Sequence, residues 1–518
     1  MSSIFVYGPP GSGKSSLGKE LANLTGFPLV DIDQEIVSNA GMPISRLMAE
    51  QGEQVFRNME SEVIAAECTR AANRPSIVAL GGGALLRNEN RALVEKTGEI
   101  LFLEASLPTL IERIGTQDLS RPLVSGAIPE KLAALLADRT NHYESFPIRV
   151  RTDDGSTLAE LAERAMRLLG FYTIKAMGRP YKVCIQAGAL ANLPTFLKTL
   201  SAGQNIIVVY DTNTRHHFEH TMATVLQAGG FWATTVELAA GEENKNLLAI
   251  EKLWNAFIDA GMDRRSLVVA VGGGVITDLV GFAVSTYMRG CRWVAVPTSL
   301  LAMVDAAIGG KTGFDLPQGK NLIGSFYPPE LVLIDPNLLS TLPQPEYISG
   351  MAEVVKHGII ADTGLFDLCS QGLATIQQHQ NQIVRRAAQV KIDVIEQDPY
   401  EKGFRAALNL GHTVGHAVEI EREFSLKHGE AISIGMVAEA TLAEKMGIAP
   451  PGLAGQIAKV LAGLGLPVQL PANVNRAKLV SFMGNDKKKA GKVVNFALPA
   501  AIGQVRTGVA IEKLEEVL

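Results

Sequence analysis

Short runs of hydrophobic residues alternate with longer segments of helical period through the first 170 residues. The runs are Ile4–Tyr7, Leu29–Ile32, Ile77–Leu80, Ile100–Leu103 and Ile148–Val150. Strand-length apolar runs that alternate with helix-period segments are typical of β–α units, so this pattern predicts a parallel sheet covered by helices. We therefore expect a three-layer α/β fold in this part of the chain.

A second alternating region follows a helix predicted over Thr157–Leu169. Its strand-like runs begin at Phe171–Lys175 and include Leu267–Val271, and they predict a Rossmann-like α/β domain. After Asp335 the pattern changes to long segments with a period of 3.6, which predicts an α-helical region. The expected domains are 1–170, 171–334 and 335–518, in line with a prior of about 150 residues per domain.

Composition narrows the class of protein. Hydrophobic residues make up 47% of the chain and charged residues 19%, as in a compact globular protein, and a net charge of −5 gives no reason to expect nucleic acid. The cysteines are scattered without a CxxC pair, so we expect reduced thiols and a cytoplasmic protein. There is no room for a signal peptide before Ile4, and no apolar run approaches the ~20 residues that cross a bilayer. No membrane partner is expected.

Residues 8–15 form the pattern GxxxxGKS between a predicted strand and a predicted helix. In that context backbone N–H groups wrap a phosphate, Lys14 reaches the β- and γ-phosphates, and the Ser15 hydroxyl binds Mg²⁺. Asp31 and Asp33 close the second strand, and Gly81–Gly83 close the third, so all should meet at one edge of the sheet. The pattern predicts an ATP site; a glycine-rich turn that merely carries Lys–Ser is the alternative.

The glycines at 272–274 also end a predicted strand and precede a helix-like segment, which indicates a second phosphate cradle. Polar side chains follow it among glycines and short apolar runs, where a soluble core usually holds no cations. They are Arg289, Asp305, Lys311, Lys320 and Asn321. A solvated, glycine-rich loop region is the alternative, and spacing alone leaves the two interpretations open.

Three candidate metal ligands occur in the helical region: Glu353, His412 and His428. A glutamate and two histidines with an open fourth position are typical of catalytic zinc. However, His412 and His416 are four residues apart on a predicted helix, and spacing alone makes them the natural pair.

The segments DIDQEI, GEQVFRNMESE, LGGGA, RPL and RTNHY, with the P-loop, resemble shikimate kinase over residues 1 to about 168. The resemblance implies 3-phosphorylation of shikimate by ATP with Mg²⁺, where Asp33 deprotonates the attacking hydroxyl and Arg121 acts on the transferring phosphoryl group. A regulatory module that only binds nucleotide is the rival. The implied contacts are Gly11, Ser12, Gly13, Lys14, Ser15, Ser16 and Arg121 for ATP, Ser15 and Asp31 for magnesium, and Asp33, Arg57, Gly82, Gly83 and Arg139 for shikimate.

The segments GGGVITDLVGF, RG, VPTSLLAMVDAAIGGKTG, GKNLIGSF, SGMAEVVKHG and ALNLGHTVGHAVE resemble 3-dehydroquinate synthase, in one order over some two-thirds of the chain. The resemblance implies a homodimer and an NAD- and metal-dependent conversion of 3-deoxy-D-arabino-heptulosonate 7-phosphate to 3-dehydroquinate and phosphate, without net redox change. The implied NAD contacts are Asp211, Asn213, Glu242, Lys245, Gly273, Gly274, Val275, Asp278, Thr298, Ser299, Lys311, Lys320 and Thr341. Thr277, Ser299 and Leu338 depart from the usual residues without removing a charge.

The same resemblance makes Glu353, His412 and His428 the ligands of zinc or cobalt and gives His416 a substrate contact or proton transfer. The implied substrate contacts are Arg289, Asp305, Lys311, Asn321, Lys356, Lys391, Arg405, Asn409, His416 and Lys487, or Lys488 in its place; Lys311, Lys356, Lys391, Arg405 and His416 are the implied catalytic residues. The whole chain is then a bifunctional enzyme of the shikimate pathway. Another sugar-phosphate cyclase, or an NAD-dependent metal alcohol dehydrogenase, is the rival for the second half.

Overall fold

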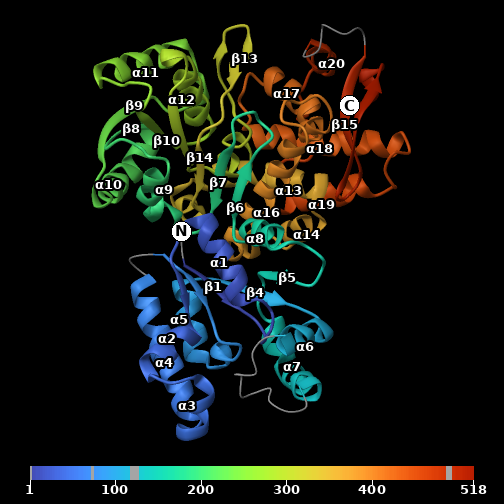
Figure 1. Cartoon of the computed structure of the whole chain (residues 1–518). Coiled ribbons are helices and arrows are strands. Elements are labelled where there is room, and N and C mark those ends of the chain that lie inside the picture. Colours follow the sequence, from blue (N-terminus) through green and yellow to red (C-terminus); the bar gives the residue numbers. More distant parts are fainter. Residues whose placement is uncertain (1–2, 72–74, 117–127, 486–492, 518) are drawn as a thin grey trace. The chain divides into compact units, whose positions relative to one another are not determined.

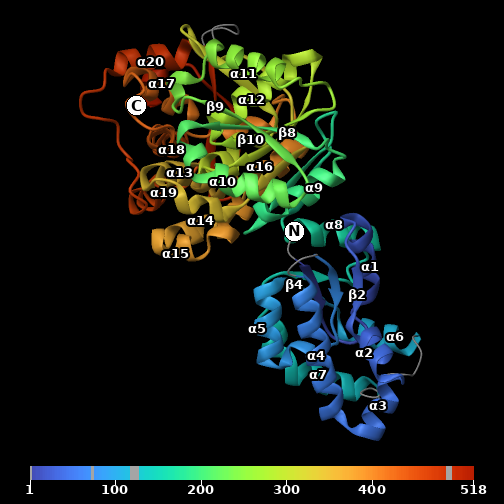
Figure 2. The same cartoon turned by 90° about the vertical axis from the view of Figure 1, so that its left-hand side faces the viewer.

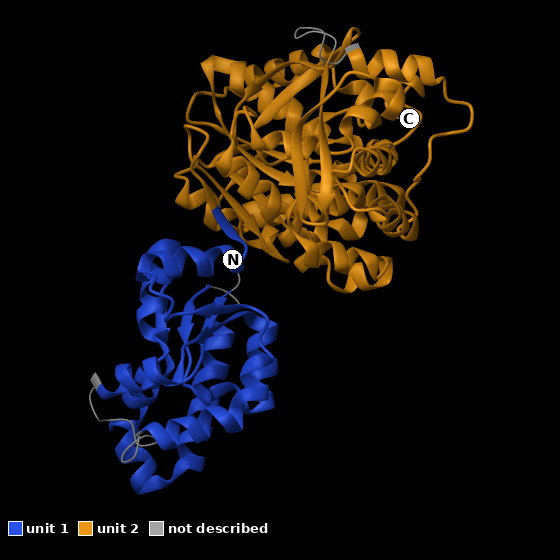
Figure 3. Ribbon diagram, turned by 90° about the vertical axis from the view of Figure 1, so that its right-hand side faces the viewer, with its two compact units in different colours: residues 1–172 blue, residues 173–518 orange. Residues whose placement is uncertain are grey.

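The computed structural model describes residues 3–71, 75–116, 128–485 and 493–517 (Figure 1). The chain divides into two compact units, residues 1–172 and 173–518 (Figure 3). No helix within the described ranges is both long and apolar enough to cross a bilayer.

The first unit is built on a five-stranded parallel sheet in the order β2-β3-β1-β4-β5. The strands are β1 (Ser3–Tyr7), β2 (Leu29–Asp31), β3 (Ile77–Ala79), β4 (Gly98–Glu104) and β5 (Arg149–Arg151). The helices are α1 (Lys14–Thr25), α2 (Ile32–Ala40), α3 (Ile44–Gln51), α4 (Glu53–Ala71), α5 (Asn88–Thr97), α6 (Leu107–Thr116), α7 (Ile128–Glu144) and α8 (Leu158–Leu168). Each predicted strand run is present, and the predicted α/β class is confirmed.

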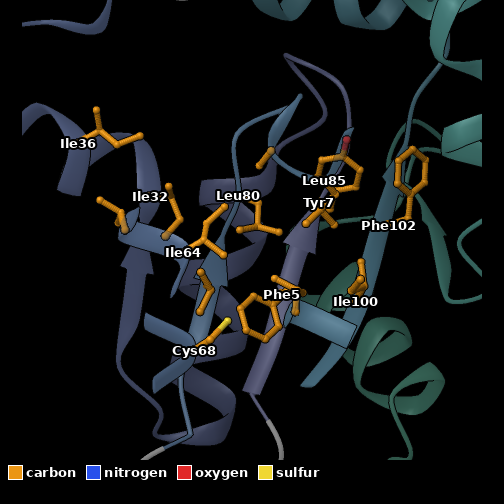
Figure 4. Packing of buried hydrophobic residues seen from close by; sticks show 14 of the residues in the cluster. Phe5, Tyr7, Ile32, Ile36, Ile64, Cys68, Leu80, Leu85, Ile100 and Phe102 are labelled. Carbon is orange, nitrogen blue, oxygen red and sulfur yellow. The ribbon is translucent and has the colours of Figure 1, made fainter. Parts of the chain in front are cut away.

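The core of this unit lies between the sheet and the helices that cover it. One buried cluster includes Phe5 of β1, Phe102 of β4, Ile32 of α2 and Cys68 of α4 (Figure 4). In the three inner strands, Ile4–Tyr7, Ile77–Ala79 and Ile100–Leu103 are apolar and buried on both faces, as expected for a parallel sheet covered by helices on both sides. This packing holds the carboxyl ends of the strands, where the P-loop follows β1, in a fixed register.

The second unit carries a seven-stranded sheet in the order β6-β7-β14-β11-β10-β8-β9, parallel from β7 to β9. The strands are β6 (Phe171–Ile174), β7 (Tyr181–Ile185), β8 (Asn205–Asp211), β9 (Trp232–Leu238), β10 (Leu267–Gly272), β11 (Arg292–Pro297) and β14 (Leu331–Ile334). Among the helices that accompany the sheet are α9 (Leu193–Thr199), α10 (Thr212–Ala228), α11 (Leu247–Asp259) and α12 (Gly274–Thr286) (Figure 2). Helix α10 packs on β8 and β9, and α12 packs on β10 and β11.

The residues after 335 are mainly helical, as the period of 3.6 predicted. The helices are α13 (Gln344–Ala361), α14 (Thr363–Ser370), α15 (Leu373–Gln378), α16 (Gln380–Gln397), α17 (His412–Glu421), α18 (His428–Lys445), α19 (Leu453–Gly463) and α20 (Arg476–Asn485). Helix α18 packs against α13, α17 and α19, so it forms the centre of this region (Figure 1).

Two antiparallel hairpins are additions that the hydrophobic pattern does not indicate. In β12 (Lys311–Leu316) and β13 (Gly319–Phe326) the alternation is interrupted by glycines, and a Cβ on Gly313 would lie 2.4 Å from the carbonyl oxygen of Ile323. Near the C-terminus, β15 (Val494–Ala501) pairs with β16 (Gln504–Ile511) through register shifts that include Pro499. Bulges and close backbone contacts of this kind hide the period of two from a pattern search.

Two candidate active sites

The P-loop lies between β1 and α1 and is shaped by glycines with left-handed backbone, Gly11 at φ 80° and Gly13 at φ 92°. The Lys14 ammonium donates to the carbonyl oxygens of Gly8 and Pro9, both at 3.0 Å. These contacts hold the lysine against its own loop. The arrangement is a glycine-rich loop followed by a helix N-terminus, which suits a phosphate group.

Asp31 connects this loop to the second strand. The Ser15 hydroxyl donates to Asp31 Oδ2 at 2.7 Å, while Oδ1 accepts from the backbone N–H of Asp33 at 3.1 Å and caps α2. Ser15 and Asp31 therefore lie side by side, and the next turn of chain directs Asp33 into the adjoining cavity. A hydroxyl and a carboxylate in contact are oxygen ligands of the kind that Mg²⁺ takes.

A cavity of about 490 Å³ lies beside these groups and collects most of the residues predicted for this half. Its lining includes Lys14, Ser15, Asp31, Asp33, Arg57, Gly81, Gly82, Gly83 and Arg139. The prediction from the strand ends, that these residues meet at one edge of the sheet, agrees with this lining. Arg121 lies outside the described residues.

Glu60 also lines the cavity, and the sequence argument did not single it out. It is 1% exposed and its Oε2 pairs with Arg57 Nη1 at 2.8 Å, while its Oε1 is buried without a hydrogen-bond partner. Burial raises the pKa of Glu60, and the neighbouring guanidinium opposes that rise. Because Arg57 and Glu60 are three residues apart on α4, the sequence could have indicated an ion pair between them. It could not have indicated that Glu60 is buried.

Hydrogen bonds to the carbonyl oxygen of Gly82 hold the glycine turn at 81–83 in place. Gly82 O accepts from the Tyr143 hydroxyl at 2.9 Å, from Arg139 Nη1 at 3.1 Å and from the Tyr7 hydroxyl at 3.3 Å. A Cβ on Gly83 would lie 2.9 Å from the Arg57 guanidinium. Glycine at this position therefore leaves that guanidinium in place, and the turn and the arginine lie against each other.

In the second unit, the strand ends of the parallel sheet again gather the predicted residues. Asp211 ends β8 and caps α10, its Oδ1 accepting from the N–H of Asn213 at 3.0 Å. Gly272 ends β10, next to Pro297 at the end of β11. Gly273, Gly274 and Val275 begin α12, and Thr298 and Ser299 follow β11. This edge is a glycine-lined helix N-terminus of the kind that binds phosphate.

Lys245 is the buried cation beside this edge. Its ammonium is 4% exposed, pairs with Asp278 Oδ2 at 2.7 Å and donates to Asn321 Oδ1 at 2.7 Å. Burial raises the pKa of Asp278 to about 6 despite the lysine. Lys320 reaches the same region, 3.6 Å from Glu242. The hairpin β12–β13 thus brings Lys320 and Asn321 to the glycine-lined edge of the sheet, the side on which a nucleotide is predicted. Within the described ranges, no contact joins Thr341 to this group.

Glu353, His412 and His428 converge from three helices. Glu353 lies within α13, and the two histidines are the first residues of α17 and α18. Glu353 Oε1 lies 3.8 Å from His412 Nε2 and 3.7 Å from His428 Nε2, and the ligand atoms of all three lie within 4.8 Å of one another. Both Glu353 oxygens are buried, and Oε2 forms an ion pair with the Lys356 ammonium. A carboxylate and two imidazoles that converge in this way fit a zinc or cobalt ion.

The charged groups of this cluster change one another's pKa values. Burial opposes ionisation of Glu353, but the ion pair with buried Lys356 and the two histidines hold its pKa well below the usual value. Burial also lowers the pKa of His412, whereas the hydrogen bonds to Glu353 and Glu419 raise the pKa of His428 to about 9. The rings of His412 and His416, the i, i+4 alternative, also lie close, with centroids 5.1 Å apart, but within the described residues His416 is grouped with Glu419 and His428 and not with Glu353.

Cations line the space beside the cluster. Lys356, Lys391 and Arg405 are buried, and Lys391 pairs with Asp305. Arg405 Nη2 donates to the carbonyl oxygen of Gly309 at 3.4 Å. Buried cations of this density fit a ligand with more than one anionic group.

Glu401 is a second carboxylate that the sequence argument missed. It has a left-handed backbone at φ 57°, pairs with Lys311 and accepts from Asn409 Nδ2 at 2.9 Å. The pKa of Glu401 is lowered, because the hydrogen bond and charge of Lys311 outweigh its burial. In the sequence it stands in the polar stretch QDPYEKG, which is typical of an ordinary turn.

One predicted residue within the described part of the chain is not joined to the set. Arg289 is exposed, with a left-handed backbone at φ 66°, and no described contact links it to the other candidates. Lys487 and its alternative Lys488 lie outside the described residues. His357, to which the sequence argument gave no role, is fully buried with both ring nitrogens lacking a hydrogen-bond partner, 4.0 Å from Asp305.

Family models match the chain in the same order as the two sites. The shikimate kinase model matches residues 10–169, the 3-dehydroquinate synthase N-terminal model residues 235–349 and the C-terminal model residues 350–489. The 3-dehydroquinate synthase of Synechocystis sp. is 43% identical over 340 residues, which are 64% of this chain and 94% of that protein. The enzyme of the same name from Picosynechococcus sp. is 42% identical over 333 residues, 63% of this chain and 91% of that protein.

Two solved structures resemble the second unit. The 2-epi-5-epi-valiolone synthase of Streptomyces hygroscopicus, with NAD⁺ and Zn²⁺ bound, is 30% identical with a TM-score of 0.60, covering 65% of this chain and 94% of that one. The 2-deoxy-scyllo-inosose synthase complexed with carbaglucose-6-phosphate, NAD⁺ and Co²⁺ is 25% identical with a TM-score of 0.61, covering 67% and 98%.

Fold, sites and relatives together define an enzyme in which a P-loop kinase domain is joined to a larger α/β and α-helical synthase. The chain belongs to the 3-dehydroquinate synthase family and carries a shikimate kinase domain ahead of the synthase, so the two resemblances seen in its motifs are confirmed. Its relatives place it in the shikimate pathway.

Proposed function

We propose that the chain catalyses two reactions of that pathway. Residues 1–170 would transfer the γ-phosphoryl group of ATP to the 3-hydroxyl of shikimate. Residues 171–518 would convert 3-deoxy-D-arabino-heptulosonate 7-phosphate to 3-dehydroquinate and phosphate. The observation that carries the second assignment is the Glu353–His412–His428 cluster beside buried Lys356 and Arg405, since it combines a metal-binding set with a seat for an anionic substrate.

In the proposed kinase reaction, the charged residues of the cavity would each bind a different part of the substrates. Lys14 and the P-loop N–H groups would hold the phosphates, with Ser15 and Asp31 at the magnesium ion. Asp33 would orient the attacking hydroxyl and accept its proton. Arg57 and Arg139 flank the glycine turn and would bind the shikimate carboxylate with paired N–H groups.

For the synthase, Glu353, His412 and His428 would hold zinc or cobalt, and the glycine edge with Asp211 and Glu242 would hold NAD. Bound there, the metal supplies Lewis-acid polarisation of a substrate hydroxyl, and NAD supplies a reversible hydride acceptor. The two structural relatives carry NAD⁺ with Zn²⁺ or Co²⁺, which supports this choice.

The chain's own side chains would do the remaining work. Lys356, Lys391 and Arg405 bind the substrate's anionic ends and offer a cationic seat to the leaving phosphate. His416 lies at the more exposed side of the cluster, 45% exposed, where it can move a proton between substrate and water. Glu401, held by Lys311 and Asn409, presents an ionised carboxylate to the same space.

We also propose a homodimer through the synthase half and a cytoplasmic location. The four cysteines are free buried thiols, which suits a reducing compartment. Light scattering of the full chain tests the dimer, and a monomer at micromolar concentration contradicts it.

The test of the synthase assignment is phosphate release from 3-deoxy-D-arabino-heptulosonate 7-phosphate with NAD below the substrate concentration. We expect turnover well beyond the NAD present, lost with a zinc-selective chelator and restored by Zn²⁺. Net accumulation of NADH with a simple polyol favours an alcohol dehydrogenase instead. Phosphate release only from a different sugar phosphate favours another cyclase, an alternative raised by the carbaglucose-6-phosphate complex of the relative.

The kinase assignment is tested by ADP formation that depends on shikimate. Lys14→Met should abolish ADP formation without changing phosphate release by the synthase. His412→Ala should abolish phosphate release without changing ADP formation. ADP formation that ignores shikimate, or none despite bound ATP, contradicts the kinase assignment.

A further inference from the structure

The imidazole of His428 lies between two carboxylates. Its Nε2 is 3.7 Å from Glu353 Oε1, and its Nδ1 is 3.4 Å from Glu419 Oε1, within hydrogen-bond reach. Glu419 is 5% exposed and lies on α17, seven residues after His412. Residues seven apart lie on the same face of a helix. One face of α17 therefore carries a metal-ligand candidate at its start and a buried carboxylate two turns later.

A histidine can bind a metal ion only through a nitrogen that carries no proton. In a neutral imidazole one nitrogen keeps the proton, and the hydrogen bond it makes decides which nitrogen that is. An ionised carboxylate accepts hydrogen bonds and cannot donate them, so the Glu419 carboxylate stabilises a proton on His428 Nδ1. Nε2 is then left free on the side of Glu353, where the other ligand atoms converge.

The surroundings of Glu419 support its ionised form. His416 Nε2 lies 4.0 Å from Glu419 Oε2, and Lys320 Nζ lies 4.0 Å from Oε1. Lys320 comes from β13, and its ammonium also stands 4.3 Å from the centre of the Phe424 ring. The Glu419 carboxylate is therefore approached by basic side chains from its own helix and from a distant hairpin, which hold it beside His428 Nδ1.

We propose that Glu419 is a positioning residue of the metal site, which keeps the proton of metal-bound His428 on Nδ1 and directs Nε2 toward Glu353 and His412. The inference rests on the proposed metal site. Glu419 acts through His428 and does not touch the ion. Its second partner, Lys320, ties the hairpin on the nucleotide side to the same carboxylate. The expected loss on its removal is in metal affinity, because the ring is then free to turn and to protonate on either nitrogen.

A different role for Glu419 is a metal ligand in its own right. His416, Glu419 and His428 also place their ligand atoms within 4.8 Å of one another. In that case His428 would have to bind through Nδ1, the nitrogen assigned to the proton above. The two roles differ in stoichiometry, since a second ligand set would let the wild-type chain take up a second ion.

The experiment measures Zn²⁺ affinity and stoichiometry of the metal-free full chain by competition with a chelator. Glu419→Met, of similar volume but without an acceptor, should bind Zn²⁺ about 10- to 100-fold more weakly. Glu419→Gln keeps an acceptor oxygen and should lose less. Glu423→Gln, an exposed glutamate just beyond the same helix, is the matched control for charge and should bind like wild type. The thermal midpoint of each metal-free chain shows whether folding changed.

The visible spectrum of bound Co²⁺ reports on the geometry of its ligands, and it would not change if Glu419 served only to stabilise the fold. The visible Co²⁺ spectrum should change in Glu419→Met and return toward wild type in Glu419→Gln. Wild-type affinity and spectrum in the methionine variant would overturn the proposal. Two equivalents of Zn²⁺ in wild type and one in Glu419→Met would also overturn it, in favour of a ligand role. If His412→Ala binds Zn²⁺ as tightly as wild type, the proposed metal site itself is wrong.

Discussion

Replacement of Lys356 by methionine tests the electrostatics of the synthase site directly. Lys356 is 1% exposed and pairs with Glu353, which is 0% exposed, one turn earlier on α13. Removal of one partner of a buried pair costs about 3–5 kcal/mol, because the other charge stays buried without compensation. His428, with its pKa raised to about 9, remains a cation 3.7 Å away at neutral pH. We therefore expect Lys356→Met to lower the free energy of unfolding of the metal-free chain by about 3 kcal/mol, near the lower end of that range.

The assay can report on this unit alone. Trp232, Trp254 and Trp293 are the tryptophans of the chain, and all lie in the second unit. Urea unfolding followed by tryptophan fluorescence should show a lower midpoint for Lys356→Met than for wild type. Lys459→Met, at an exposed lysine of α19, is the control and should unfold like wild type.

Metal should reverse the effect, because a divalent cation compensates Glu353 better than an ammonium does. With saturating Zn²⁺ the stability deficit of Lys356→Met should shrink, and its Zn²⁺ affinity should equal or exceed that of wild type. A metal-free variant as stable as wild type would refute the reasoning. So would a deficit that Zn²⁺ leaves unchanged, since Lys356 and the metal would then not share Glu353.

Three further predictions concern other parts of the chain. Arg57→Met should raise the KM for shikimate about 10- to 100-fold, the value of a lost charged hydrogen bond of about 1.5–3 kcal/mol, with little effect on KM for ATP in a coupled ADP assay; an unchanged KM places the carboxylate elsewhere. Burial and Lys356 lower the pKa of His357 to about 4, below the ordinary 6.5, so its stabilising contribution is complete above pH 6.5 and is lost as the pH falls through 4. That loss amounts to about 3 kcal/mol at 1.36 kcal/mol per pKa unit, and urea midpoints of His357→Leu should fall less steeply with acid than those of wild type; parallel curves contradict it. A zinc-selective chelator with excess Mg²⁺ should stop phosphate release but leave ADP formation intact, and loss of both activities argues against independent metal sites.

Much of each site was predictable because short-range patterns place its parts. A strand, GxxxxGKS and a helix are contiguous, so the P-loop follows from local sequence. Asp31 and Gly82 follow predicted strands, and in a parallel sheet all strand ends with the same direction meet at one edge. Spacing left the pair His412 and His416 open, and the family motifs favour His412 with His428 instead, a choice of ligands that stays a prediction.

The residues that were missed are carboxylates that serve as partners to cations. Glu60 and Glu419 lie inside the segments that carry the two resemblances but were given no role, and Glu401 stands in a polar stretch that is typical of a turn. Their significance comes from burial and from partners that lie on other elements or on the same helix: Arg57, Lys311 and His428. Of these pairs, only Glu401 and Lys311 are far apart in sequence. Hydrophobic periodicity carries no information about which acid will face which base across the fold.

The sequence by itself determined the alternation of strands and helices, the glycine turns at the strand ends and the family to which the chain belongs. All of these depend on residues close together in the chain, where backbone geometry and side-chain period act directly. Only the tertiary structure decided that Glu353 loses water completely, that His428 lies between two carboxylates and that Lys320 reaches Glu419 from a hairpin about a hundred residues away. Those facts depend on burial, because desolvation sets the strength of a charge contact and arises only when distant segments pack together.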